Sequence, residues 1–569
     1  MRNAFQLVTS SNRRWALYAL FIFVLVAYPL IYIGNYAGDS QVHLVYGENA
    51  SRGAFFEFNL GEKSAGVTAP GYMLLIAGFF KAAPDTWVPL LIKATNLLFW
   101  YGLVALVFLS AKALTRSARW ATVGALAFGL MPGSVYNATN GMENGIFAFL
   151  IAAWILGAMR TRWFEPGRLV TDAFWTEVLL GALLGVACWF RPEGFAVAAV
   201  ALTFRAVMSM RSATDLGRTI ARSTVTLVPF VVIAGVLVYF HWDQTGHFIP
   251  TSGSSRVLMS NLATDTIRAG TVYFTPNMTI RLVQYFPLTV TSFLAIWMAF
   301  QGRGNLGPSR EIIGFLAVMF WSFFVLYSFV LGSVHLSRYL IFAMPALVLM
   351  AVVGAKWASE RWDGSEWLGL KHAPELTAVL LVVALIGVYS METGLRLKLD
   401  SQASLWRSMQ APMQRQPFSD ELFRLLGEPE SRPISIALQE IQARYWLDDR
   451  FVVRSLDGRI DPVLLDYTDR VSVDHVGYLK ERQVQFLLDT PNYNRDPDTW
   501  SLMHLDGLMP GEKLSRAGVT FSRIAIDRSP FELADQAEAG EPRWFTGEAG
   551  LIRLHWFIDY LIRLDYQEP

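Results

Sequence analysis

The chain has 569 residues, of which 53% are hydrophobic and only 17% are charged. Soluble domains carry about a quarter charged residues, so this composition excludes a wholly soluble protein and indicates a polytopic membrane protein with a polar part attached. The net charge of +1 gives no electrostatic reason to expect nucleic acid as a partner. The single cysteine, Cys188, excludes intrachain disulfides.

Long apolar segments recur through residues 1–394. A helix that crosses the hydrocarbon core needs about 20 apolar residues. The first such segment follows Arg13-Arg14 and has no Ala-x-Ala-type cleavage site, so we expect a retained span and no cleaved signal peptide. The predicted spans lie near residues 15–34, 87–111, 119–133, 143–159, 175–190, 194–209, 222–240, 284–301, 311–332, 339–355 and 376–393.

The apolar segment 68–83 decides the topology. If it crosses the membrane, all later basic connectors fall outside, against the positive-inside rule. If it lies along the outer face, those connectors fall in the cytoplasm, so we predict eleven spans, a cytoplasmic N-terminus in the plasma (inner) membrane, and a juxtamembrane helix at 68–83. The segments then predicted outside are Asp39, Glu143, Arg191, the 241–282 loop, His335, Arg338 and everything after about residue 395.

The tail 395–569 has frequent Arg, Asp and Glu and no apolar run long enough to span a membrane. The segments that begin at Ile434 and Val484 are typical of short buried strands, and 418–426 and 474–482 are typical of helices. The sequence therefore predicts a mainly α transmembrane domain over 1–394 and a small extracytoplasmic α/β domain over 395–569.

Asp39 lies a few residues after the first apolar segment. A carboxylate is costly to hold near hydrocarbon, so an acid at this position indicates a site. It can act as a general base that takes a proton from an acceptor hydroxyl; the alternative is a cap for a helix expected over 41–52. His43 follows four residues later on the same helical face, where it either orients an acceptor or serves the structure.

Glu143 is a second acid at the mouth of an apolar helix, within Asn140-Gly-Met-Glu-Asn144. It can cap the helix that begins at Asn144, where a negative charge suits the helix dipole. It can equally bind or orient an acceptor, and the sequence leaves both roles open.

Three cations, Lys93, Arg191 and Arg338, occur near the same predicted membrane face. Two of them have a structural alternative: Lys93 can extend to the interface, and Arg191 can pair with the nearby Glu193. Together with the two acids they fit a lipid phosphate beside a general base. His335 and Tyr339 flank Arg338 and complete the candidate substrate-binding residues.

The sequence shows no Walker A or dinucleotide motif, no Cys/His cluster with metal-ligand spacing and no nucleophile elbow. We therefore expect no nucleotide cofactor and no dedicated metal site, and the question of metal dependence stays open. No internal repeat is evident.

Several motifs follow one another in a specific order. They are Gly38-Asp39-Ser40-Gln41-Val42, Asn59-Leu60-Gly61-Glu62, Thr68-Ala69-Pro70-Gly71-Tyr72, Gly141-Met142-Glu143-Asn144, Arg191-Pro192-Glu193-Gly194, Arg338-Tyr339-Leu340 and Asp449-Arg450-Phe451-Val452-Val453. This order resembles the GT-C superfamily of integral-membrane glycosyltransferases that use polyprenyl-phosphate sugars, and within it the bacterial branch that contains mycobacterial-type arabinofuranosyltransferases.

The resemblance implies a GT-C fold and inverting transfer of a sugar from a polyprenyl-phosphate donor, with the outer-loop Asp39 as base. It favours arabinofuranose as the sugar, while mannose and other sugars remain open. The implied acceptor is a cell-envelope glycan, a glycolipid or a protein. Two positions depart from the branch: Gly38 replaces a frequent acid and Val45 replaces a frequent Arg.

Two other functions remain open. A transporter or flippase of a lipid-linked glycan would have inverted repeats and interrupted helices in matching halves, which the sequence does not show. A catalytically inactive GT-C scaffold is suggested by Gly38 alone.

Overall fold

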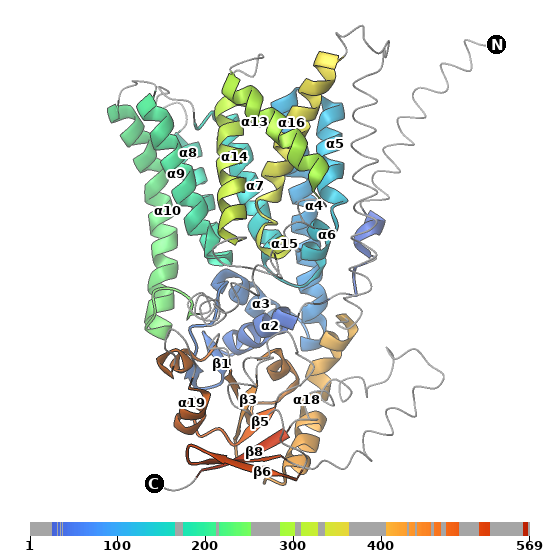
Figure 1. Cartoon of the computed structure of the whole chain (residues 1–569), viewed down its shortest axis with the longest axis vertical. Coiled ribbons are helices and arrows are strands. Elements are labelled where there is room, and N and C mark those ends of the chain that lie inside the picture. The colour runs from blue at the N-terminus through green and yellow to red at the C-terminus, as the bar shows by residue number, and fades with distance from the viewer. Residues whose placement is uncertain are drawn as a thin grey trace, which may run out of the picture. The chain divides into compact units, whose positions relative to one another are not determined.

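The computed structural model divides the chain into two units, drawn in Figure 1. The helical unit comprises Met1–Tyr36, Lys93–Gly235 and Val272–Ser404, and the mixed unit comprises Ala37–Ile92, Val236–Thr271 and Leu405–Pro569. The structure describes residues 26–30, 32–34, 36, 38–164, 174–211, 216–251, 285–301, 309–327, 336–362, 405–429, 432–438, 441–456, 460–467, 474–488, 511–523 and 561–566.

Helices, most of them apolar and two of them short, build the helical unit (Figure 1). Their bounds are α4 Val88–Thr115, α5 Ala118–Gly129, α6 Pro132–Thr139, α7 Asn144–Arg160, α8 Phe174–Phe190, α9 Glu193–Arg211, α10 Leu216–Thr245, α13 Phe286–Gln301, α14 Ser309–Val325, α15 Leu336–Tyr339 and α16 Met344–Trp362. Helices α4 and α10 extend across the boundary into the mixed unit.

The predicted spans can be compared with these helices. Among the described residues, three helices are long and apolar enough to cross a membrane, and the pair α6 and α7, bent by 119°, can make a fourth. The count of eleven spans is therefore not confirmed. The predicted span 376–393, and most of 15–34, lie outside the described residues; each of the others coincides with a helix.

Small residues let the apolar helices approach closely, as is common where helices pack in membranes. A Cβ atom added at Gly354 of α16 would lie 1.9 Å from the backbone oxygen of Thr291 on α13. A Cβ at Gly181 of α8 would lie 2.0 Å from the backbone oxygen of Thr226 on α10. At both positions the backbone of the neighbouring helix occupies the space that a side chain would need.

The mixed unit combines the C-terminal sheet with segments from the start of the chain (Figure 1). Its early elements are α2 Gly38–Ser51, β1 Glu57–Asn59, β2 Glu62–Lys63, α3 Pro70–Ala82 and the short helix η1 Asp85–Trp87. Its late elements are α18 Leu405–Leu426, β3 Ile434–Leu438, η3 Ile441–Trp446, β4 Phe451–Ser455, η4 Pro462–Tyr467, α19 His475–Glu481, β5 Phe486–Leu488, β6 Lys513–Arg516, β7 Val519–Arg523 and β8 Leu561–Tyr566.

The late strands form a six-stranded sheet in the order β4-β3-β5-β8-β7-β6. Strand β3 runs parallel to β4 and β5, and the remaining pairs are antiparallel. Buried side chains such as Ala437, Leu487, Phe521 and Ile562 pack with Tyr478 of α19 into one core. The predicted strands at 434 and 484 and the helices at 418–426 and 474–482 are present as β3, β5, the end of α18 and α19.

The predicted juxtamembrane helix 68–83 is present as α3. Its 13 residues extend about 20 Å at 1.5 Å per residue, which is shorter than a hydrocarbon core of about 30 Å. It packs along α2 inside the mixed unit.

Contacts within the mixed unit also bear on topology. The backbone amide of Thr251, beyond the end of α10, donates to the carbonyl of Ala65, and Glu62 of β2 pairs with Arg454 of β4. The loop after the first span, the end of α10 and the C-terminal domain must therefore lie on one side of any membrane that α10 crosses.

Gly354→Ala tests the close approach of α13 and α16. The added methyl group has no room against the Thr291 backbone, so we expect a loss of about 1–3 kcal/mol of stability, as for other overpacked cores. Thermal unfolding of the detergent-solubilised protein measures the effect. Gly235→Ala is the matched control, because nothing lies within 4 Å of its added Cβ; equal midpoints for the two variants would contradict the packing described.

His475 makes the stability of the mixed unit depend on pH. The ring is buried at the start of α19, and its Nε2 atom lies 3.2 Å from the carbonyl oxygen of Leu456. Burial lowers the pKa of His475 below its ordinary value, and the contact with Leu456 only partly opposes this. The unfolded chain therefore binds the proton more readily, and stability falls as the pH drops below about 6.5, by at most about 1.36 kcal/mol per pH unit.

His475→Gln removes the titrating group, so its thermal midpoint should fall less between pH 7.5 and pH 5.5 than that of the unsubstituted protein. Groups that titrate elsewhere affect both proteins alike, and an equal fall in both would contradict the prediction.

Candidate functional site

Asp39 lies in the first turn of α2 and is half-buried. The helix begins at Gly38, three residues earlier than expected, so Asp39 is a residue of the helix and does not precede it as a cap. A carboxylate in a first turn is stabilised by the positive end of the helix dipole. The side chain is thus held as part of a rigid element and is still partly accessible.

His43 lies one turn further along α2 and is 7% exposed. Its ring meets the ring of Tyr72 on α3 edge to face, with 5.4 Å between the centroids. This contact places His43 on the face of α2 that packs against α3.

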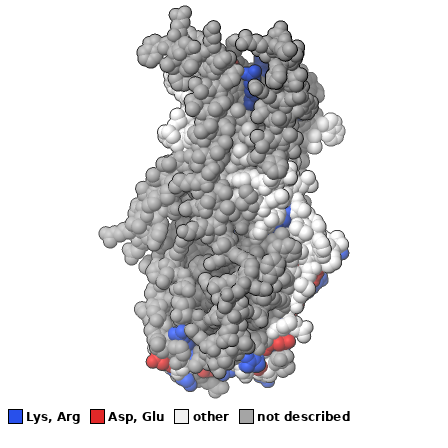
Figure 2. Space-filling model, turned by 90° about the vertical axis from the view of Figure 1, so that its right-hand side faces the viewer, with Lys and Arg blue, Asp and Glu red and all other residues white. Residues whose placement is uncertain are grey.

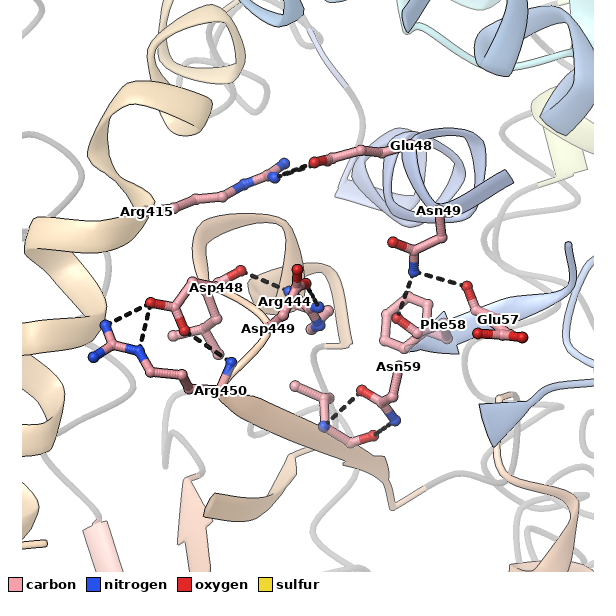
Figure 3. A network of polar contacts seen from close by, with 12 residues as sticks. Glu48, Asn49, Glu57, Phe58, Asn59, Arg415, Arg444, Asp448, Asp449 and Arg450 are labelled. Carbon is pink, nitrogen blue, oxygen red and sulfur yellow. Dashed lines mark hydrogen bonds and ion pairs between the residues drawn. The ribbon is translucent and has the colours of Figure 1, made fainter. Parts of the chain in front are cut away.

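The other end of α2 is clamped by arginines (Figure 3). Glu48 accepts hydrogen bonds from Arg415 of α18, at 2.8 Å, and from Arg52, at 2.7 Å. Arg52 also bonds Asp449 at 3.0 Å, and Arg444 bonds the second oxygen of Asp449 at 2.7 Å. Sequence reasoning missed this network; its one local signal is the four-residue spacing of Glu48 and Arg52.

Burial raises the pKa of the Asp449 carboxyl, but the hydrogen bond and charge of Arg444, with those of Arg52, outweigh burial and leave the pKa below its ordinary value. Asp449 is therefore ionised at neutral pH and holds both arginines.

Two asparagines attach the hairpin of β1 and β2 to its neighbours in the mixed unit (Figure 3). The amide nitrogen of Asn49 donates to the carbonyls of Glu57 and Phe58, at 2.9 and 3.2 Å. The side chain of Asn59 bonds both the N–H and the C=O of Val453, each at 2.9 Å. Val453 belongs to β4, the edge strand of the sheet, so Asn59 satisfies polar groups that an edge strand otherwise leaves open.

The rest of the Asn-Leu-Gly-Glu motif completes this attachment. Gly61 has a φ of +84°, which only glycine adopts readily, and it makes the tight turn between β1 and β2. Glu62 binds both terminal nitrogens of Arg454, at 2.5 and 2.8 Å. The Asn-Leu-Gly-Glu motif therefore joins the first loop to the C-terminal strands in this chain.

A cavity of about 150 Å³ lies along this junction. Its charged lining is largely paired, since Asp461 accepts from Arg482 at 2.5 Å and from the hydroxyl of Tyr478 at 3.1 Å. On the face drawn in Figure 2, described acidic and basic side chains likewise gather together at the end that carries the strands. Paired charge of both signs characterises this end of the mixed unit.

The helical unit gathers a second polar cluster. Arg191, between α8 and α9, donates to Glu143 at 2.7 Å and forks onto both oxygens of Glu193, at 3.1 and 2.7 Å. It also donates to Asn144 at the start of α7. Glu143 occupies the N-cap position of α7 but makes no side-chain capping bond, so its oxygen serves Arg191 and does not cap the helix.

Tyr339 joins the third predicted cation to this cluster. The guanidinium groups of Arg191 and Arg338 lie 5.3 and 5.5 Å from the centroid of its ring, within the range of cation–π attraction. Tyr327 stacks on the same ring at 5.1 Å and donates its hydroxyl to Glu193 at 2.5 Å. Glu143, Arg191, Arg338 and Tyr339 thus meet in one place.

Lys93 lies near this cluster on α4. It is fully buried, donates to the carbonyl of Ile33 and lies 5.6 Å from the ring centroid of Tyr36. Asn96, one turn further along α4, donates to the carbonyl of Met142 next to Glu143 at 2.9 Å. His335 lies outside the described residues, and Asp39 and His43 belong to the mixed unit.

A third polar cluster, centred on Glu177, was missed by sequence reasoning. Glu177 in the first turn of α8 accepts from Arg205, Arg222, Thr226 and Trp163 at 2.5–3.3 Å. Arg191 follows the other end of α8, so the two clusters lie at opposite ends of this helix. A buried acid among two arginines is expected to hold α8, α9 and α10 together.

No family model and no curated protein matches the sequence, but solved structures resemble it. ArnT from Cupriavidus metallidurans bound to undecaprenyl phosphate matches with a TM-score of 0.51 and 14% identity, over 87% of this chain and 96% of that one. The apo oligosaccharyltransferase from Archaeoglobus fulgidus matches with a TM-score of 0.53 and 12% identity, over 85% of this chain and 71% of that one. The chain has the GT-C fold.

The GT-C fold predicted from the sequence is therefore confirmed. At these identities the similarity concerns the fold alone, and the chemistry has to be argued from the site. The mycobacterial arabinofuranosyltransferase AftD also matches, with a TM-score of 0.36 and 15% identity over 76% of this chain and 32% of that one. That similarity is too low to bear on the choice of sugar.

Asn59→Ala tests the junction between the hairpin and β4. It leaves the N–H and C=O of Val453 without their side-chain partner, and an unsatisfied buried group costs about 1–3 kcal/mol. We expect a lower thermal midpoint and faster hydrogen exchange at residues 451–455. Lys513→Ala, at an exposed side chain of the same unit, is the control and should leave the midpoint nearly unchanged. Equal midpoints for Asn59→Ala and Lys513→Ala would contradict this account.

Proposed function

We propose that the protein is a membrane glycosyltransferase that moves a sugar from a polyprenyl-phosphate donor to an acceptor hydroxyl. The observation that carries the proposal is the fold, shared over 87% of this chain with ArnT, whose structure holds undecaprenyl phosphate. The Archaeoglobus fulgidus oligosaccharyltransferase AglB, which has the same fold with a TM-score of 0.52, was solved with a dolichol-phosphate. Two enzymes of one architecture with polyprenyl lipids support a donor of that class.

Asp39 is the base in this proposal. Its carboxylate takes the proton of the acceptor hydroxyl while that oxygen attacks the anomeric carbon of the donor sugar. The bond from that carbon to the phosphate oxygen breaks, the electron pair leaves with the lipid phosphate, and the configuration inverts. A half-buried acid at the start of a rigid helix suits a base that must meet the incoming hydroxyl in a fixed position.

The departing phosphate needs positive charge, and fixed cations are usually the largest contribution to such a step. We assign this role to Lys93, Arg191 and Arg338. Arg191 is also paired with Glu143 and Glu193, which hold its guanidinium group in place.

The remaining candidates have two roles in this proposal. Glu143 and Tyr339 hold Arg191 in place, and His43 and His335 orient the acceptor. The proposed donor carries no nucleotide, and the proposal makes no assignment of a metal ion.

The finer assignments come from the sequence. The motif order favours arabinofuranose as the sugar and a cell-envelope glycan, glycolipid or protein as acceptor. We propose that the site faces the outside of the plasma membrane, with the N-terminus in the cytoplasm. The contacts that put the first loop and the C-terminal domain on one side support a single outer face for both.

Asp39→Asn tests the proposal. The amide keeps the shape of the side chain but accepts no proton at neutral pH, so transfer from a synthetic polyprenyl-phosphate sugar should fall by about 10²–10⁴-fold. Mass spectrometry of the glycosylated acceptor measures the rate, and thermal unfolding verifies that the variant is folded. Asp243→Asn, at an exposed acid of the same unit, is the control and should retain full activity.

Three results would contradict parts of this proposal. Full transfer by Asp39→Asn would remove Asp39 as the base. Unsubstituted protein that transfers no sugar but moves lipid-linked glycan across liposome membranes would favour the flippase alternative. Protein that does neither with any donor offered would favour an inactive scaffold.

A further inference from the structure

The helix that carries Asp39 is braced along its length by the C-terminal part of the mixed unit. Near its start, Gln41 donates to the hydroxyl of Ser408 at 3.4 Å, and near its end Glu48 accepts from Arg415 at 2.8 Å. The two contacts are seven residues apart on α2 and seven residues apart on α18. A residue near the start of α2 and a residue near its end are thus each bound to a side chain of α18.

The pair Glu48 and Arg415 is the firmest point of this brace. The side chains are 7% and 15% exposed, and the second oxygen of Glu48 also lies 2.7 Å from Arg415. Arg415 further donates to the carbonyl of Tyr445 in η3 at 2.8 Å and lies 4.7 Å from the centroid of the Tyr445 ring. The hydroxyl of Tyr445 donates a hydrogen bond to the carbonyl of Ser408 at 3.1 Å. This closed set of contacts fixes α2, α18 and η3 against one another.

The last turn of α2 is held as well. Arg52 bridges Glu48 and Asp449, and Arg444 bonds the second oxygen of Asp449. Three arginines and two carboxylates therefore surround the end of the helix, and each carboxylate is bound by two arginines. Taking Glu48 away would separate the largely buried Arg415 from the carboxylate that it pairs with, which is costly.

We infer that Glu48 and Arg415 are positioning residues, through which the C-terminal domain sets the location of the Asp39 carboxylate. The inference rests on the proposed function of Asp39. Nine residues separate Asp39 from Glu48, which is about 13.5 Å along a helix. Because a helix moves as a rigid body, a shift at Glu48 displaces Asp39, and a misplacement of about 1 Å can cost roughly 10²-fold in rate.

A positioning role has a kinetic signature that general destabilisation lacks. The proposed function assigns donor binding to Lys93, Arg191 and Arg338 and not to Glu48 or Arg415, so loss of the brace should lower kcat and leave the KM for the donor nearly unchanged. Loss of folded protein would lower the total activity but not the kcat of the molecules that remain folded.

Glu48→Gln and Arg415→Lys make the test in the full-length protein. Glu48→Gln removes the negative charge but keeps the size of the side chain. We expect kcat to fall about tenfold or more, toward the roughly 10²-fold loss of rate that a misplacement of about 1 Å can cause. The KM for the donor should change by less than about twofold. Arg415→Lys keeps the charge and one donor, so it should retain more activity than Arg415→Gln. Glu428→Gln is the control, because it breaks an ion pair with Arg563 in the same unit without touching α2.

Hydrogen exchange supplies a readout that does not depend on the reaction. Glu48→Gln should speed exchange over residues 38–51 and leave the sheet strands β3 and β5 unchanged. Unchanged kcat together with unchanged exchange in α2 would overturn the inference, and so would a fall in kcat of the same size in Glu428→Gln. If the unsubstituted protein transfers no sugar, the proposed function fails, while the exchange measurement still decides whether the brace holds α2.

Discussion

A charged side chain that is taken out of water is stable only beside a partner of opposite sign, and this constraint organises both units of the protein. Arg191 lies between two glutamates, Glu177 lies between two arginines, and Glu48 receives Arg415 and Arg52. Each cluster joins helices that apolar packing alone would leave free to slide. Charge pairing therefore gives an otherwise uniform set of apolar helices its specific arrangement.

The same constraint shapes the proposed reaction. A lipid phosphate brings negative charge to the membrane boundary, where few compensating groups are available. Arg191 lies between Glu143 and Glu193, and Lys93 is fully buried, donates to the carbonyl of Ile33 and lies near the ring of Tyr36. The two cations thus have different surroundings, a difference that residue types alone do not reveal.

The C-terminal domain has a larger part in this architecture than a sequence boundary at residue 395 implies. The C-terminal domain binds Asn59 and Glu62 of the first loop, and its Arg415 binds Glu48 of α2, the helix that carries Asp39. Residues 37–92 and 405–569 therefore belong to one folded unit. The location of the proposed base therefore depends on residues that lie almost four hundred positions later in the sequence.

The sequence by itself determined the elements whose signal is local. Runs of apolar residues predicted the helices over 87–111, 143–159 and 194–209, and short apolar segments predicted β3 and β5. Such elements can be predicted because burial of a continuous stretch makes neighbouring residues apolar. The motif order was enough to predict the GT-C fold. Only the tertiary structure decided that Glu143 serves Arg191 and does not cap its helix, and that Asn59 completes the edge of β4. Such pairs join residues 48 and 394 positions apart, and nothing in a local pattern encodes which distant partner compensates a buried polar group.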